Sequence, residues 1–75
     1  MITTEEIEGM IQKKIPGANI RVADMTGTGD HFEIEVVSEL FKGKSLIDQH
    51  RMVFAALEKE MDGRIHAVQL KTKSP

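Results

Sequence analysis

Apolar residues near the start of the chain recur at helical spacing. They are Ile7, Met10, Ile11 and Ile15, three or four positions apart. Thr3 and Glu6 have the spacing of a capping box, and Pro16-Gly17 stops the pattern. We expect a helix that begins after Thr3 and buries one face.

A second apolar stripe follows Gly43. It consists of Leu46, His50, Val53, Phe54, Leu57 and Met61. Ser45 and Asp48 have N-cap spacing, and Gly63 is placed to be the C′ residue. This pattern predicts a longer helix whose stripe, His50 included, faces the core.

Three other segments alternate between apolar and polar residues, as strands do. Ile20 and Val22 stand among polar neighbours, and residues 31–38 (HFEIEVVS) place Phe32, Ile34 and Val36 on one face. The TGTGD turn (26–30) between them predicts a hairpin whose other face, with Glu33 and Glu35, is wet. Residues 64–72 (RIHAVQLKT) predict a third strand, but the pattern leaves open which face is buried.

The order helix, strand, strand, helix, strand predicts one α+β domain over residues 1–75. Both helices should cover one face of a three-stranded sheet. The connection from the second strand to the third has crossover length, which favours parallel, right-handed pairing and therefore a mixed sheet.

Composition narrows the function classes. The 75 residues include no cysteine, so neither disulfides nor thiolate metal sites are available. No stretch reaches the roughly 18–20 apolar residues of a membrane span, and the start, MITTEEIEGM, lacks the basic residues of an export signal. We expect a cytoplasmic protein without a membrane partner.

The net charge of −2 is unevenly distributed. Residues 1–39 hold three basic and eight acidic residues (−5), and residues 40–75 hold seven basic and four acidic residues (+3). An anionic partner would therefore meet the second part. Alternatively, the two parts complement each other within the fold.

Catalytic patterns do not emerge. The GTGD segment lacks the lysine and the following helix of a phosphate-binding loop. Ser38 and Ser45 could be nucleophiles, but nothing brings a base and an orienting acid to either serine. We predict that the protein is not an enzyme.

The three histidines, His31, His50 and His66, are the strongest metal ligands, but no pair has finger-type spacing. An open site shared with another protein fits them better than a closed one. His50 lies on the apolar stripe, which favours a partly buried, hydrogen-bonded structural residue, and Arg51 should reach solvent or a carboxylate. His66 is an exposed surface histidine or a ligand.

A small basic rim surrounds Gly43. Lys42, Lys44 and Arg51 stand near a helix start, where backbone amides also attract phosphate. Because phenylalanine is the only aromatic residue, a base-stacking platform is not evident. The rim is therefore a weak nucleic-acid footprint.

Taken together, these motifs resemble the BolA family over nearly the whole chain. The resemblance rests on V-S-x-x-F-x-G (residues 37–43), H-R-x-V (50–53), and I-H-A (65–67) leading to K-T (71–72). It implies a fold similar to class II KH domains, with a helix-turn-helix-like element around Gly43.

The resemblance also implies a partner and a cofactor. A monothiol glutaredoxin and glutathione would share a [2Fe–2S] cluster with the protein, and the histidine of I-H-A, His66, would be a ligand. Imidazole can replace thiolate on one iron of such a cluster. Many relatives carry a second ligand in the hairpin loop, but here TGTGD has no cysteine, which leaves His31 as the candidate.

Two hypotheses follow. In the first, the protein is an adaptor in iron–sulfur trafficking or iron regulation, without cofactor and monomeric or weakly dimeric when isolated. Its docking surface would include Lys42, Gly43, Lys44, His50 and Arg51. The alternative is a DNA-binding transcription regulator that places Lys42, Lys44 and Arg51 on phosphates, with salt-sensitive binding.

Overall fold

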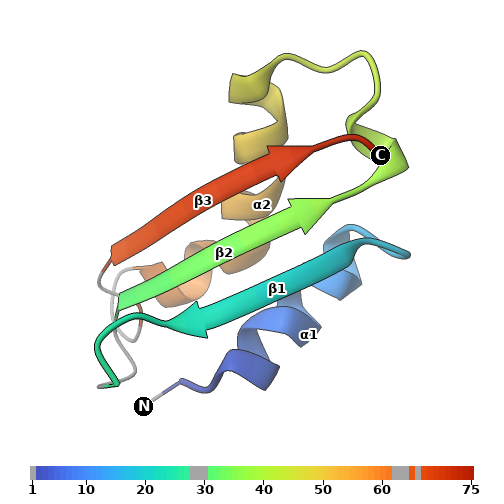
Figure 1. The fold of residues 1–75 in the computed structure, drawn as a ribbon. Coiled ribbons are helices and arrows are strands. Elements are labelled where there is room, and N and C mark those ends of the chain that lie inside the picture. Colours follow the sequence, from blue (N-terminus) through green and yellow to red (C-terminus); the bar gives the residue numbers. More distant parts are fainter. Residues whose placement is uncertain (1, 28–30, 62–64, 66) are drawn as a thin grey trace.

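The computed structural model describes residues 2–27, 31–61, 65 and 67–75. Along the chain lie α1 (Thr4–Lys14), β1 (Asn19–Asp24), β2 (His31–Val37), the 3₁₀ helix η1 (Glu39–Phe41), α2 (Leu46–Met61) and β3 (Ala67–Lys73) (Figure 1). The predicted α+β order is confirmed.

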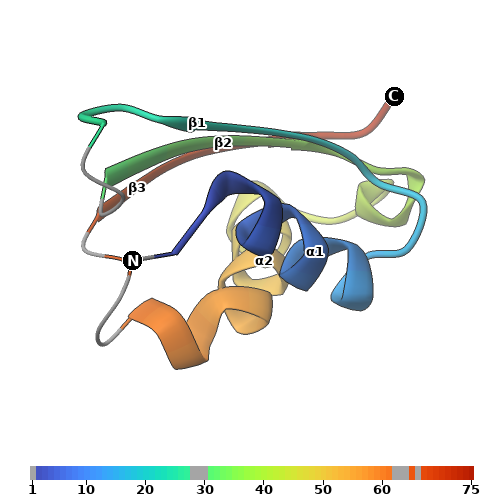
Figure 2. The same ribbon diagram turned by 90° about the horizontal axis from the view of Figure 1, so that it is seen from below.

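The three strands form one mixed sheet in the order β1-β2-β3. β1 pairs antiparallel with β2, and β2 pairs parallel with β3. Both helices lie on the same face of the sheet, and the opposite face is left open (Figure 2). The predicted mixed sheet with helices on one face is therefore correct.

Both helices begin with the predicted side-chain caps. Thr3 and Glu6 form a reciprocal capping box at α1. At α2, the Ser45 hydroxyl accepts the Asp48 N–H at 3.2 Å. Such bonds satisfy amides that have no partner inside the helix. Gly63, predicted as the C′ residue of α2, lies outside the described residues.

The core fills the space between the helices and the sheet. Its fully buried large side chains are Ile2, Ile7, Ile11, Ile15, Phe32, Ile34, Val36, Phe41, Val53, Leu57 and Ile65. On β3, Val68, Leu70 and Thr72 are half-buried while the alternate residues are exposed. This pattern answers the question that the sequence left open, because the even-numbered residues of β3 face the helices.

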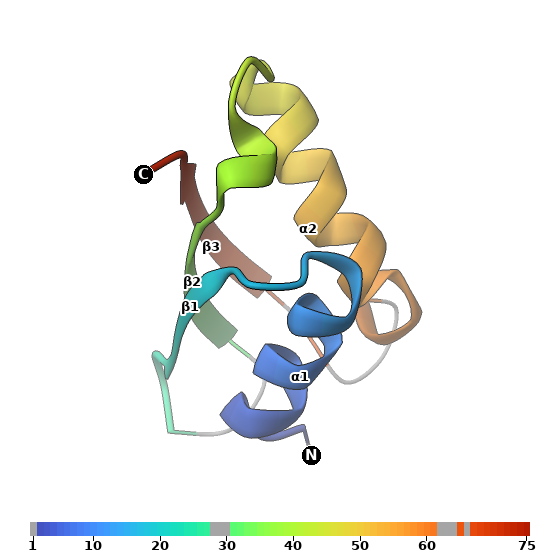
Figure 3. The ribbon, with the colours of Figure 1, turned by 90° about the vertical axis from the view of Figure 1, so that its right-hand side faces the viewer.

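Two apolar members of the α2 stripe do not reach the core: Leu46 is exposed, and Phe54 is half-buried without packing against the core. Leu46 is 59% exposed, and its neighbour Ile47 is 65% exposed. The first turns of α2 extend beyond the sheet on the β3 side, so the sheet does not cover them (Figures 1 and 3). The prediction that Leu46 is buried was wrong for this reason. In the described part of the chain, no helix is long and apolar enough to cross a membrane.

Candidate functional sites at two ends of the sheet

The predicted site residues that the structure describes fall at two opposite ends of the sheet. β2 and β3 start together, with His31 opposite Ala67, and run in parallel to Val37 opposite Lys73. We call the first the loop end and the second the helix-start end, because η1 and the start of α2 follow β2 there. A seven-residue strand is roughly 20 Å long, which separates the two ends.

The loop end carries His31, which is half-buried at the first position of β2. Its carbonyl oxygen accepts the Met25 N–H at 2.9 Å and closes the hairpin ladder. At the end of β1, the Asp24 carboxylate accepts the Gly27 N–H at 2.9 Å. The backbone of the hairpin therefore fixes the place of His31.

The predicted ligand His66 lies outside the described residues, but its chain neighbours are described. Ile65 is fully buried and donates its N–H to the Glu60 carbonyl oxygen at 2.9 Å. Ala67 is the register partner of His31. The chain on both sides of position 66 is therefore anchored at the loop end.

The donor groups of this chain suit a shared metal centre better than a closed one. The sequence has no cysteine, and among the described residues no three His, Asp or Glu side chains gather to hold an ion. A cluster bound here would need thiolate ligands from another molecule. Imidazole nitrogen is the donor that this chain can add.

The helix-start end is held by a series of short hydrogen bonds. The buried Ser38 hydroxyl accepts the Leu40 N–H at 3.0 Å, while the Ser38 N–H bonds the Lys73 carbonyl oxygen at 3.1 Å. The Lys44 N–H then reaches the Phe41 carbonyl oxygen at 3.0 Å. Ser38, like Ser45, is a capping residue, which accounts for both serines without a nucleophilic role.

Gly43 allows the chain to turn into α2. Its φ of +78° lies in the left-handed region, where glycine alone avoids a steric cost. Lys42 and Lys44 on either side are exposed. A three-residue 3₁₀ helix, this turn and α2 occupy the segment where the resemblance implied a helix-turn-helix-like element, which stays a prediction.

Arg51 is exposed and lies 4.0 Å from the Asp48 carboxylate, one helical turn earlier. The prediction that it reaches solvent or a carboxylate is confirmed. This acid partly offsets the basic rim. Neither the geometry nor the relatives named below add support to the nucleic-acid alternative, which stays a prediction.

His50 is half-buried, as predicted, and its ring meets the edge of Phe54 with centroids 6.4 Å apart. Its ring makes no hydrogen bond with any other described residue, so that part of the interpretation was wrong. The aromatic contact takes the place of the predicted polar one.

Sequence reasoning missed the exposed apolar residues at the helix-start end. Leu40, Leu46 and Ile47 expose 49%, 59% and 65% of their surface. Ile47 carried the available signal, because it lies outside the apolar stripe of α2 and therefore had no predicted place in the core. The segment from Leu40 to Arg51, which includes the predicted docking surface, thus exposes both basic and apolar side chains.

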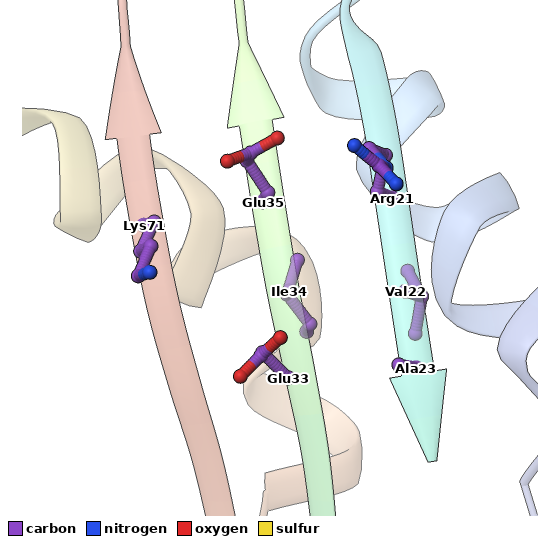
Figure 4. A pocket seen from close by; sticks show the side chains of 7 residues that line it. All are labelled: Arg21, Val22, Ala23, Glu33, Ile34, Glu35 and Lys71. Carbon is purple, nitrogen blue, oxygen red and sulfur yellow. The ribbon is translucent and has the colours of Figure 1, made fainter. Parts of the chain in front are cut away.

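The open face of the sheet carries alternating charge. Glu35 of β2 lies between Arg21 of β1 and Lys71 of β3 in the strand register, over a shallow depression of about 310 Å³ (Figure 4). Glu33 follows on the same face. This is the wet face that the alternation of β2 predicted.

The fold and these two ends define a small α+β protein of the order α-β-β-α-β. Residues 9–75 match the family model described as BolA-like protein. The chain belongs to the BolA family, as the sequence motifs indicated.

Individual relatives agree with this assignment. The chain is 47% identical over 72 residues to Protein BOLA2 of Arabidopsis thaliana, covering 95% of this chain and 76% of that protein. Among solved structures, BolA1 from A. thaliana superposes with a TM-score of 0.88 at 25% identity, covering 100% of this chain and 95% of that one. The BolA domain of SufE1 from A. thaliana has a TM-score of 0.84 at 27% identity, covering 100% and 96%.

Proposed function

We propose that this BolA-like protein is an adaptor that binds a monothiol glutaredoxin and shares a [2Fe–2S] cluster with it. The role would lie in iron–sulfur cluster assembly, cluster trafficking or iron regulation. His66 would be the cluster ligand from this chain, and His31 the candidate second ligand.

The strand register is the observation that best supports this proposal. Because β2 and β3 are parallel and start together, His31 is opposite Ala67, the residue directly after His66 in sequence. Residues 31 and 66 are far apart along the chain, yet the pairing brings their segments to one end of the sheet. The absence of cysteine also fits a cluster whose thiolates come from glutaredoxin and glutathione.

The cluster would be cargo, held between two proteins and passed on. A bound [2Fe–2S] cluster could accept or give up one electron at iron, and this chain would supply neutral imidazole nitrogen to it. Imidazole must be neutral to bind iron, so acid should compete with iron for the nitrogen lone pair. Ligation by one or two histidines would make the shared cluster sensitive to acid.

The roughly 20 Å between the two ends also sharpens the docking hypothesis. A glutaredoxin that brings a cluster to the loop end would have to extend along the whole sheet to touch Lys44 and Arg51 as well. Variants at each end therefore test cluster sharing and docking separately.

The experiment is to mix the protein with cluster-loaded monothiol glutaredoxin and record visible absorption and circular dichroism. We expect the wild type to change the cluster spectrum and His66→Ala to abolish that change. Lys14→Ala is the control, since it changes an exposed residue of α1 that belongs to neither the ligand set nor the docking surface, and it should leave the change intact. Unchanged spectra with wild type, or equal behaviour of His66→Ala and wild type, would reject the proposal.

His31→Ala then tests the second ligand. If His31 binds iron, the variant should form a shared cluster with an altered spectrum and faster loss of iron to a chelator. A spectrum identical to that of the wild type would leave His66 as the one ligand from this chain.

A further inference from the structure

The outer edge of β3 offers unpaired backbone groups. The Ser38 N–H bonds the Lys73 carbonyl oxygen, and in a parallel ladder the bonded residues alternate along the strand. Odd-numbered residues of β3 therefore bond to β2. The N–H and C=O groups of Val68, Leu70 and Thr72 point outward, and no backbone hydrogen bond to another described residue engages them.

A groove of about 370 Å³ lies along the second half of this edge, between β3 and the first turns of α2. Leu46, His50 and Leu70 line the side toward the helices. This groove exists because α2 extends beyond the edge of the sheet and forms a ledge beside β3 (Figures 1 and 3). We call the edge and the groove together the β3 edge site.

The charge at this site is mainly positive. Lys71 and Lys73 line it from the open face of the sheet, and Glu35 is the one acid among its lining residues. A strand added beside β3 would place alternate side chains on opposite faces. One set would meet Leu46 and Leu70, and the other would meet the two lysines.

We propose that the β3 edge site binds an extended segment of a partner protein in which apolar and acidic residues alternate. The segment adds a fourth strand to the sheet: its backbone bonds Val68, Leu70 and Thr72, its apolar side chains enter the groove, and its carboxylates face Lys71 and Lys73. Backbone pairing of this kind supplies affinity, while the side-chain pattern supplies selectivity.

This inference goes beyond the proposed cluster sharing and does not depend on it. The groove lies at the helix-start end, and His31 lies at the other end of the sheet. A failure of one experiment leaves the other proposal standing.

The probe is the capped peptide Asp-Val-Glu-Leu-Glu-Val-Asp, which matches β3 in length at seven residues. Titration followed by two-dimensional amide NMR should shift the signals of Val68, Leu70 and Thr72 and slow the hydrogen exchange of these amides. Two versions of the peptide, N-methylated at the apolar or at the acidic positions, provide the backbone control. Only one of them should bind, because alternate amides face β3.

Charge reversal tests the lysines. Replacing both Lys71→Glu and Lys73→Glu should weaken binding about tenfold or more, since two attractions become repulsions. The matched control, Lys13→Glu with Lys14→Glu on α1, changes net charge equally and should leave the affinity within about twofold.

Three results would overturn the proposal. The first is the absence of shifts along β3, and the second is equal binding by both methylated peptides. The third is self-association of the peptide-free protein, seen as concentration-dependent shifts of the same three amides. That outcome would assign the edge to a second copy of the chain.

Discussion

The loop end and the helix-start end of the sheet present different kinds of surface. At the loop end, the backbone fixes the position of His31, and the proposed chemistry would rest on histidine nitrogen. At the helix-start end, Ser38 and Phe41 are buried while Leu40, Leu46 and Ile47 are exposed in the same short segment. A few buried groups there hold a surface whose composition is that of a docking site.

The difference shows that one small sheet carries two separate surfaces. Parallel pairing of β2 and β3 carries both ends on one rigid ladder, so neither end can move alone without breaking strand hydrogen bonds. The proposed ligand site and the proposed docking site lie at opposite ends, so substitutions can alter one without touching the other. Variants within each end can test whether the contrast holds.

The largest effect is expected for Phe41→Ala. Phe41 is 1% exposed in the core, so its loss should lower the free energy of unfolding by about 3–5 kcal/mol. For a domain of 75 residues this is a large share of the total. Urea unfolding measures it. Leu40→Ala, the exposed neighbour, should change stability by less than about 0.5 kcal/mol, and equal losses would contradict the contrast.

Glycine substitutions compare the two ends directly. Gly43 and Gly27 have similar φ, +78° and +74°, and a Cβ at either would meet no atom within 4 Å. The cost of alanine is therefore backbone strain alone, about 1–2 kcal/mol for Gly43→Ala. Backbone hydrogen bonds of Lys42 and Lys44 hold the conformation of Gly43, whereas Gly27 is held by the Asp24 side chain, which can adjust, so Gly27→Ala should cost less. Thermal unfolding of the two variants measures both losses of stability. A larger loss for Gly27→Ala than for Gly43→Ala would contradict this expectation.

The smallest effect is expected for Arg51→Ala. Its pair with Asp48 is exposed and 4.0 Å long, so removing it should change stability by less than about 0.5 kcal/mol. Unfolding at low and high salt should give nearly the same difference. A loss above about 1 kcal/mol would mean that Arg51 stabilises the helix-start end.

Local patterns predicted most of the fold. Capping serine and threonine, the stripe of α1 and the alternation of β2 are short-range signals, and each was confirmed. The exposure of Leu46 was not predicted, because helical periodicity indicates which residues share a face but not how far the neighbouring sheet extends.

The candidate sites were harder to predict for a similar reason. Lys42 to Arg51 are close in sequence, so their common location was foreseeable. The pairing of His31 with Ala67 depends on strand register, which the sequence pattern left undefined. His66 was predicted as a ligand only because the I-H-A motif resembles that of the family. The sequence pattern also did not predict that the two groups of site residues lie at opposite ends of the sheet.

The parallel ladder also has a consequence for the order of folding. The β1–β2 hairpin closes over a short turn, but every β2–β3 pair joins residues 36 positions apart (67 − 31). Closing such a loop costs entropy before any strand bond forms. We therefore expect the hairpin and α2 to form early and β3 to join last. In the native protein, β3 should then be the strand that opens first, and its amides should exchange with solvent ahead of those of β2.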